Sequence, residues 1–182
     1  MTTTGTSTRT YAIDASHSSV HFSVRHLMIS KARGTFGITS GTIGLSGAGN
    51  IPTFVEVSID VASIDTREAQ RDGHLKSADF FDVEKFPEMH FSSTSIGAVS
   101  GDSFDVHGEL EIIGVKKPVT LKASIAGAGK DPWGNDRIAY EASVKIHRKD
   151  WGLTWNQALE AGGVAVGDEI DITLDVESIP KA

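Results

Sequence analysis

The sequence predicts an all-β protein that folds as a single antiparallel barrel of about eight strands. Apolar and polar residues alternate with a period of two in many successive segments, as in strands with one face on a core. Turn sequences such as SGAGN, SGDS and KDPWGND separate these segments at spacings typical of antiparallel meanders. Glycines inside the second segment favour the coiled strands of a barrel over two packed sheets. Such a barrel leaves room inside for side chains and one elongated small molecule.

The expected strands follow one another along the whole chain. In order, they are SVHFSVRHL, KARGTFGITSGTIGL, FVEVSIDVASI, PEMHFSSTSI, FDVHGELEII, VTLKASI, IAYEASVKIH and EIDITLDVE. The second is a strand or hairpin broken by glycine, and the fourth has the weakest alternation. In the third, Val55, Val57 and Ile59 form an apolar face against Glu56 and Ser58, so the apolar side chains are expected to point inward.

Two segments interrupt the alternation. From Thr66 to Phe86 the chain loses its period of two and spaces apolar side chains at helical intervals, which predicts a short helical connection capped by Thr66 or Asp72. From Lys149 to Gly167 the chain makes a glycine-rich excursion that contains two tryptophans. Both segments are expected to lie over one end of the barrel, where aromatic side chains would seal or gate it.

Composition excludes several classes of function. The chain of 182 residues, 39% of them hydrophobic, is long enough for one substantial core, and its net charge of -7 argues against binding nucleic acid. It has no cysteine, so disulfides and thiolate metal sites are excluded. The polar start MTTTGTSTRTYAID is unlike a secretory signal, and no run of about 18 apolar residues predicts a spanning helix. We expect a cytoplasmic protein with a disordered leader over residues 1–10 and one barrel domain over residues 11–179.

Charged and polar groups in RDGHLKSADFFD raise the question of catalysis. Asp72, His74 and Ser77 have the residue types of a hydrolase triad, but no GxSxG motif accompanies them, and such a cluster more often caps a helix. Seven histidines suggest a metal, yet no HExxH motif or carboxylate pair supports one. His26 is placed on the apolar face of its strand, where it would be either a satisfied buried group or a haem ligand.

Several motifs together resemble those of the YceI-like polyisoprenoid-binding proteins. They are YAIDASHSSVHFSVRHL, ARGTFG, SIDT, RDGHLKSADFFDVEKFPEMHFSST, GELEIIGVKKPVTL and VGDEIDITLDVE, which run in the family's order from about Tyr11 to about Val176. The resemblance implies a lipocalin-like barrel without catalysis or cofactor, often a homodimer, whose interior holds a polyisoprenoid or another long amphiphilic lipid. Many relatives are exported with a signal peptide, a segment not recognised here.

The expected ligand-binding residues combine the inward faces of the strands with the two interrupting segments. The lipid tail is expected among Phe22, Val24, Val57, Ile59, Phe91, Leu110, Ile112 and Val144, with Phe80 and Phe81 from the connection. His26, Arg148, Trp151 and Trp155 are the expected contacts of a polar head. Two alternatives stay open: a hydrolase or isomerase that acts on a lipid with His26 or His74 as the base, and a barrel that binds haem or a metal.

Overall fold

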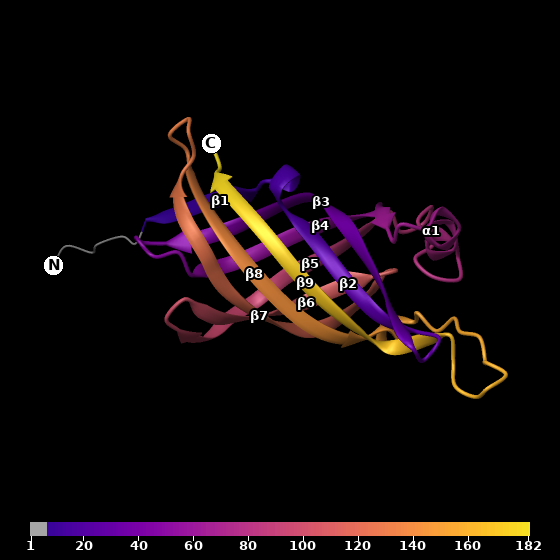
Figure 1. Cartoon of the computed structure of the whole chain (residues 1–182). Coiled ribbons are helices and arrows are strands. Elements are labelled where there is room, and N and C mark those ends of the chain that lie inside the picture. Colours follow the sequence, from indigo (N-terminus) through magenta and orange to yellow (C-terminus); the bar gives the residue numbers. More distant parts are fainter. Residues whose placement is uncertain (1–6) are drawn as a thin grey trace.

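A computed structural model describes residues 7–182 as an antiparallel barrel with little helix (Figure 1). Its strands are β1 (Thr8–Ile13), β2 (Ser19–His26), β3 (Ser30–Ser46), β4 (Pro52–Asp65), β5 (Glu88–Ser100), β6 (Ser103–Ile112), β7 (Val115–Lys130), β8 (Asp136–His147) and β9 (Val166–Pro180). Its helices are η1 (Ala15–His17), α1 (Ala69–Lys76) and η2 (Arg148–Trp151). The predicted fold class is confirmed: eight strands close a barrel and one strand is extra.

Closure of the barrel depends on the pairing of β3 with β4, which joins the two ends of the sheet order β3-β2-β9-β8-β7-β6-β5-β4. The extra strand β1 also pairs with β3 and β9, but only at residues beyond the reach of β2. Strand β2 pairs with Ser30–Phe36 of β3, whereas β1 pairs with Thr42–Ser46 of the same strand. Strands β1 and β2 therefore share one position in the barrel, with η1 between them.

The position of β1 contradicts part of the predicted disordered leader, which was expected to span residues 1–10. Residues 1–6 lie outside the part of the chain that the structure describes. Strand β1 already begins at Thr8, which pairs with Ser46 of β3, so residues 8–10 belong to the sheet. The sequence did not predict a strand at these Thr and Arg residues, because a polar segment lacks the apolar alternation on which the prediction depended.

The glycine-rich second segment forms one continuous strand, β3, instead of a broken strand or hairpin. Its glycines provide room for large neighbours within the barrel wall. A Cβ atom at Gly34 would collide with the ring of Phe22, and one at Gly44 would collide with the ring of Phe54. Here glycine allows close approach of a side chain and does not end the strand.

The interruptions of the alternation lie where the sequence predicts them. Helix α1 and the turns after it connect β4 to β5, and η2 begins the excursion that leads to β9. The cap of α1 differs from the prediction, because the side chain of Glu68 accepts hydrogen bonds from the backbone N–H groups of Gln70 and Arg71. Both segments lie at one end of the barrel, called the α1 end here.

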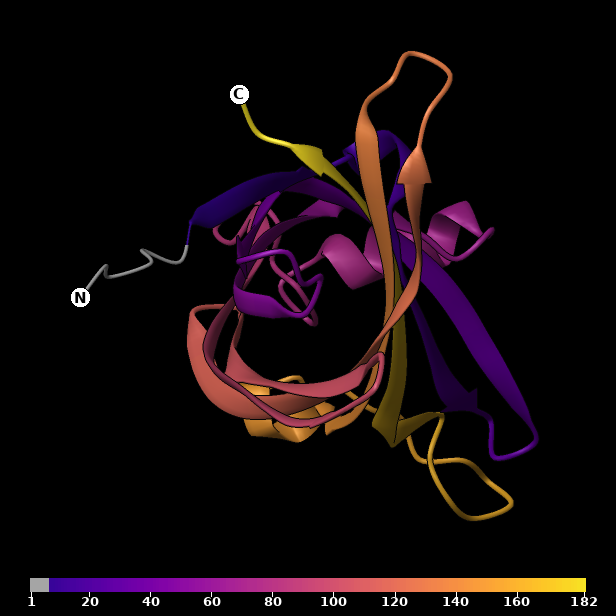
Figure 2. The same ribbon diagram turned by 90° about the vertical axis from the view of Figure 1, so that its left-hand side faces the viewer.

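The view along the barrel shows a ring of strands with α1 at its far end (Figure 2). Inward-facing side chains from the strands form one apolar cluster, in which Leu45 and Val61 are fully buried. No helix within residues 7–182 has both the length and the apolar character needed to cross a membrane.

Candidate functional site

The interior of the barrel contains an elongated cavity with an almost wholly apolar lining. Its lining runs from Ile13 and Tyr140 at the end opposite α1 to Leu75 and Val166 at the α1 end. The cavity has a volume of about 200 Å³. Because successive side chains of a strand point to opposite faces, the alternation in the sequence places these apolar groups inside.

Most of the predicted ligand-binding residues line this cavity. They are Phe22, Val24, Val57, Ile59, Phe80, Phe81, Phe91, Leu110, Ile112, Val144 and Arg148. Further lining residues on β7, β8 and β9 are not among the predicted ones, among them Ala123, Ala142, Ile170, Ile172 and Leu174. The signal for them was present, because all five lie on the apolar faces of the segments that the alternation identified.

Three of the predicted residues do not line the cavity: His26, Trp151 and Trp155. His26 is the last residue of β2 and is half-buried. The β2 and β9 strands have an irregular register beyond Val24, and His26 pairs with Val166, where the lining ends. Alternation predicts the face on which a side chain lies but not how far along the strand the cavity extends. His26 therefore lies beside the end of the described lining and is not part of it.

The two tryptophans support the wall and the end of the barrel from outside the cavity. The buried indole of Trp151 donates a hydrogen bond from Nε1 to the carbonyl oxygen of Leu110, at 2.8 Å. The ring of Trp155 contacts Phe80 and His74, with centroid distances of 5.3 and 4.7 Å. Phe80 lines the cavity, so Trp155 packs behind a lining residue.

Arg148 is a buried cation at the α1 end, and its guanidinium is directed to the backbone of the excursion that follows it. Its Nη1 donates to the carbonyl oxygens of Leu153 and Trp155, at 2.6 and 3.0 Å. Its Nε donates to Gly167 at 2.8 Å. Burial lowers the pKa of Arg148, while the nearby carboxylate of Asp168 acts in the opposite direction. These contacts make Arg148 a clamp that holds the excursion over the barrel.

Hydrogen bonds within the connection after β4 hold its cavity-lining side chains in place. Asp72 accepts hydrogen bonds from the backbone N–H and the hydroxyl of Thr66. Arg71 donates to the hydroxyl and the carbonyl oxygen of Thr66, both at 2.8 Å. With the segment held in this way, Phe80 and Phe81 line the cavity.

The residues of the hypothetical triad face separate partners. Asp72 accepts from Thr66, the ring of His74 contacts Asp79 at 2.9 Å, and the Ser77 hydroxyl donates to the carbonyl oxygen of His74 at 2.6 Å. No hydrogen bond joins the Ser77 hydroxyl to the His74 ring or that ring to Asp72 among the described residues. The cluster therefore lacks the chain of contacts that activates a serine nucleophile.

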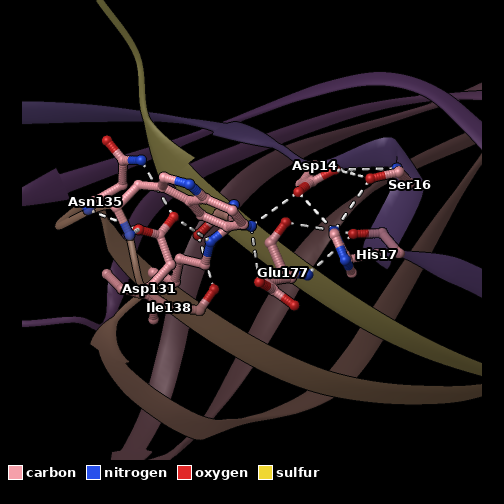
Figure 3. Close-up of polar contacts among 11 residues, drawn as sticks. Asp14, Ser16, His17, Asp131, Asn135, Ile138 and Glu177 are labelled. Atoms are coloured by element: carbon pink, nitrogen blue, oxygen red, sulfur yellow. Dashed lines mark hydrogen bonds and ion pairs between the residues drawn. The ribbon is translucent and has the colours of Figure 1, made fainter.

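A second polar cluster joins η1 to β8, β9 and the turn before β8 (Figure 3). Arg137 Nη1 donates to the carboxylates of Asp14 and Glu177, each at 2.9 Å, and its Nε donates to Asp131 at 3.0 Å. His17 Nδ1 lies 2.8 Å from Asp14. The candidate ligand atoms of Asp14, His17 and Glu177 are within 4.8 Å of one another, as a metal site requires. Arg137 already pairs with both carboxylates, so we interpret the cluster as an ion-pair network that joins η1, β8 and β9.

The network makes stability depend on pH. Hydrogen bonds from Ser16, Arg137 and His17 hold the pKa of the Asp14 carboxyl well below its ordinary value. Burial alone would raise the pKa of Asp131, but hydrogen bonds from Asn135, Arg137 and Trp133 lower it to about 2. A carboxyl with a lowered folded-state pKa contributes stability above its unfolded pKa of about 4, and this contribution is lost as pH falls through the folded value.

We expect Arg137→Gln to lower the melting temperature by a few degrees at pH 7. The difference in melting temperature from the unchanged protein should shrink between about pH 4 and pH 2. At low pH the carboxyls become protonated, and Arg137 of the unchanged protein then stabilises them less. Thermal unfolding followed by circular dichroism across this pH range measures both effects. Lys122→Gln is the control, since Lys122 pairs with Asp105 on the barrel surface and should change little. A constant difference at all pH values would contradict this role of the network.

The eight-stranded antiparallel barrel and its elongated apolar cavity place this protein in the class of barrels that have interior space for one small ligand. The model of the YceI-like domain matches residues 11–178, so the chain belongs to the YceI-like family. It is 38% identical over 173 residues to Protein YceI of Salmonella newport strain SL254, covering 94% of this chain and 87% of that protein.

Solved structures of the same fold agree with this assignment. A Campylobacter jejuni YceI protein is 30% identical, with a TM-score of 0.73 and coverage of 87% of this chain and 90% of that one. A polyisoprenoid binding domain from Saccharophagus degradans is 16% identical, with a TM-score of 0.67 and coverage of 94% and 98% of the two chains. The resemblance that the motifs indicated is thereby confirmed at the level of the family.

Proposed function

We propose that this protein binds a long-chain polyisoprenoid or a similar amphiphilic lipid inside the barrel, without catalysis, in order to carry or store it. The observation that carries the proposal is the almost wholly apolar lining that continues along the barrel from Tyr140 to Val166. Membership of the YceI-like family supports it, as does the structural likeness to a domain described as polyisoprenoid binding.

The size and chemistry of the cavity suit a long apolar tail. The eight barrel strands have 8 to 17 residues, and a strand of about ten residues with a rise of ~3.3 Å, tilted by ~40°, already spans about 25 Å of barrel depth. Each buried CH₂ group contributes up to ~0.8 kcal/mol, so a few prenyl units offset the unfavourable free energy of association. Affinity of this kind requires little polar recognition.

The polar groups near the cavity have structural partners, which supports binding over chemistry. The Tyr140 hydroxyl donates to the carbonyl oxygen of Asn50 at 2.7 Å, and Arg148 donates to the backbone of the excursion. Glu141, the remaining charged residue of the described lining, is exposed. No histidine belongs to the lining within residues 7–182. His26 and His74, the candidate bases of a lipid-acting hydrolase or isomerase, are therefore not among the described lining residues.

Solvent extraction followed by mass spectrometry tests the proposal directly. The purified protein should release a prenyl lipid into organic solvent, or after delipidation should take up an added polyprenol at a stoichiometry near one per chain. Uptake is measured by gel filtration with quantification of the lipid in the protein peak. A linear polyether of similar length is the control, because its oxygen atoms would be desolvated in the apolar cavity. A protein that contains no lipid and takes up no polyprenol would contradict the proposal.

A further inference from the structure

The turn between β2 and β3 exposes three consecutive apolar side chains. The exposed fractions are 40% for Leu27, 49% for Met28 and 82% for Ile29. Leu27 and Met28 have positive φ angles of 52° and 63°, a conformation that favours glycine and asparagine. The positive φ angles favour glycine or asparagine, and exposure to solvent favours polar side chains. We therefore infer that the apolar side chains have a role at the surface.

A neighbouring loop extends this apolar surface. The Leu27 backbone N–H donates to the carbonyl oxygen of Ala165 at 2.9 Å, which fixes the turn against the segment before β9. Met28 lies over Gly163, where a Cβ atom would be 3.0 Å from Met28 Cγ. Val164, between these contacts, is 38% exposed. We call Leu27, Met28, Ile29 and Val164 the apolar tip.

The apolar tip adjoins the end of the cavity. Val24 and Val166 line the cavity and lie within three residues of Leu27 and Val164 in the sequence. Both loops of the tip are at the α1 end of the barrel (Figure 1), as is the connection whose Phe80 and Phe81 line the cavity. The apolar surface of the interior and that of the tip are thus nearly continuous.

The β2–β3 hairpin carries basic residues on both sides of the tip, whereas the start of β9, which pairs with β2, carries Asp168, Glu169 and Asp171. Residues 25–33 contain Arg25, Lys31 and Arg33 and no acidic residue, in a protein with a net charge of -7. Lys31 lies 3.9 Å from Asp171, and neither Arg25 nor Arg33 forms an ion pair within the described part of the chain. The adjoining loop, residues 152–165, has one acidic residue, Glu160.

We propose that the apolar tip and the three basic residues beside it dock the barrel on an anionic lipid bilayer, with the α1 end of the cavity toward the membrane. Apolar side chains enter the boundary of the acyl chains while Arg and Lys meet the lipid phosphates. A bilayer suits this surface better than a second copy of the chain, because a symmetric contact would bring the basic residues of the two copies together. The purpose of docking, exchange of a lipid between membrane and cavity, rests on the proposed function.

Vesicle flotation of the full chain tests the docking. Vesicles of phosphatidylglycerol and phosphatidylcholine without any isoprenoid should bind the protein at about 0.1 M salt, and binding should weaken at high salt because the charges are screened. The double variant M28S/I29S should lose at least about tenfold in binding, which corresponds to the burial of roughly two CH₂ groups. The variant K31Q/R33Q should also bind less and should lose most of the salt dependence.

Matched controls come from the opposite end of the barrel. Val99, near the end of β5, is 56% exposed, and Trp133, in the turn before β8, is 81% exposed, so Val99→Ser and Trp133→Ser should bind vesicles as the unchanged protein does. Equal losses in these variants and in M28S/I29S would overturn the proposal. Absence of binding of the unchanged protein to anionic vesicles would also overturn the proposal. The same holds if the unchanged protein does not bind vesicles but forms a dimer that the M28S/I29S substitutions dissociate.

A second assay separates docking from lipid binding. A polyprenol supplied on cyclodextrin, without a membrane, should enter M28S/I29S as readily as the unchanged protein. A protein that docks on vesicles but takes up no polyprenol contradicts the proposed function and leaves the docking supported. A protein that takes up polyprenol from cyclodextrin but does not bind vesicles contradicts the docking alone.

Discussion

Replacing Ala142 with tryptophan is expected to abolish measurable polyprenol binding while the barrel stays folded. Ala142 lies on β8, pairs with Ala123 and Leu174, and lines the cavity together with both of them. The indole would extend into space that the lipid tail needs. Displacing even one five-carbon prenyl unit removes up to about 4 kcal/mol of apolar burial, which is on the order of a thousandfold in affinity.

The measurement is titration of the delipidated protein with polyprenol, with circular dichroism to verify the fold. Ser143→Trp provides the matched control, because Ser143 is the next residue of β8 and its side chain is exposed on the outer face. That variant should bind normally. If Ala142→Trp bound polyprenol as tightly as the unchanged protein, the ligand would have to lie elsewhere than in the barrel.

Replacing Arg148 with methionine is expected to cause a large loss of stability. Methionine keeps an unbranched apolar stem but donates no hydrogen bond, so the carbonyl oxygens of Leu153, Trp155 and Gly167 lose their partner. Each buried acceptor left without a partner costs about 1–3 kcal/mol, and partial access of water to the loop reduces the sum. We expect a loss of about 2–4 kcal/mol, or roughly 5–15 °C in melting temperature.

Thermal and urea unfolding measure this loss, and Lys149→Met is the control. Lys149 is the next residue, is exposed, and contacts Asp168 at 3.2 Å on the surface, so its removal should cost little. The loss of stability in Arg148→Lys should lie between those of Arg148→Met and Lys149→Met, because an ammonium cannot donate to carbonyl oxygens in three directions as a guanidinium does. An Arg148→Met protein as stable as the Lys149→Met protein would contradict the role of Arg148 as a clamp.

The sequence by itself determined the barrel and the inward faces of its strands. Side chains of a strand alternate between its faces because of backbone geometry alone, so the apolar positions of each segment indicate the interior without knowledge of the partner strands. Val57, Ile59, Leu110 and Ile112 were identified in this way, and all four line the cavity. That they bind a lipid stays a prediction.

The resemblance to family motifs predicted features of the connection after β4 that the alternation of apolar residues alone did not. The run RDGHLKSADFFD has the composition of a catalytic cluster, yet the resemblance and the loss of alternation predicted a capped connection with Phe80 and Phe81 on the interior. Hydrogen bonds of Arg71 and Asp72 to Thr66 and the position of the two phenylalanines agree with this interpretation.

Only the tertiary structure decided which distant groups meet and where the cavity ends. Arg137 and Asp14 are 123 residues apart, and nothing in either local sequence shows that they pair. The pairing of β1 with β3 and β9 places a polar segment in the sheet, and the irregular register of β2 and β9 leaves His26 beyond the lining. Arg148 has the inward parity of its strand, but its hydrogen-bond partners follow from the path of the excursion after it. The physical reason is the same in each case: alternation is set within one strand, whereas register, closure and ion pairs depend on the whole barrel.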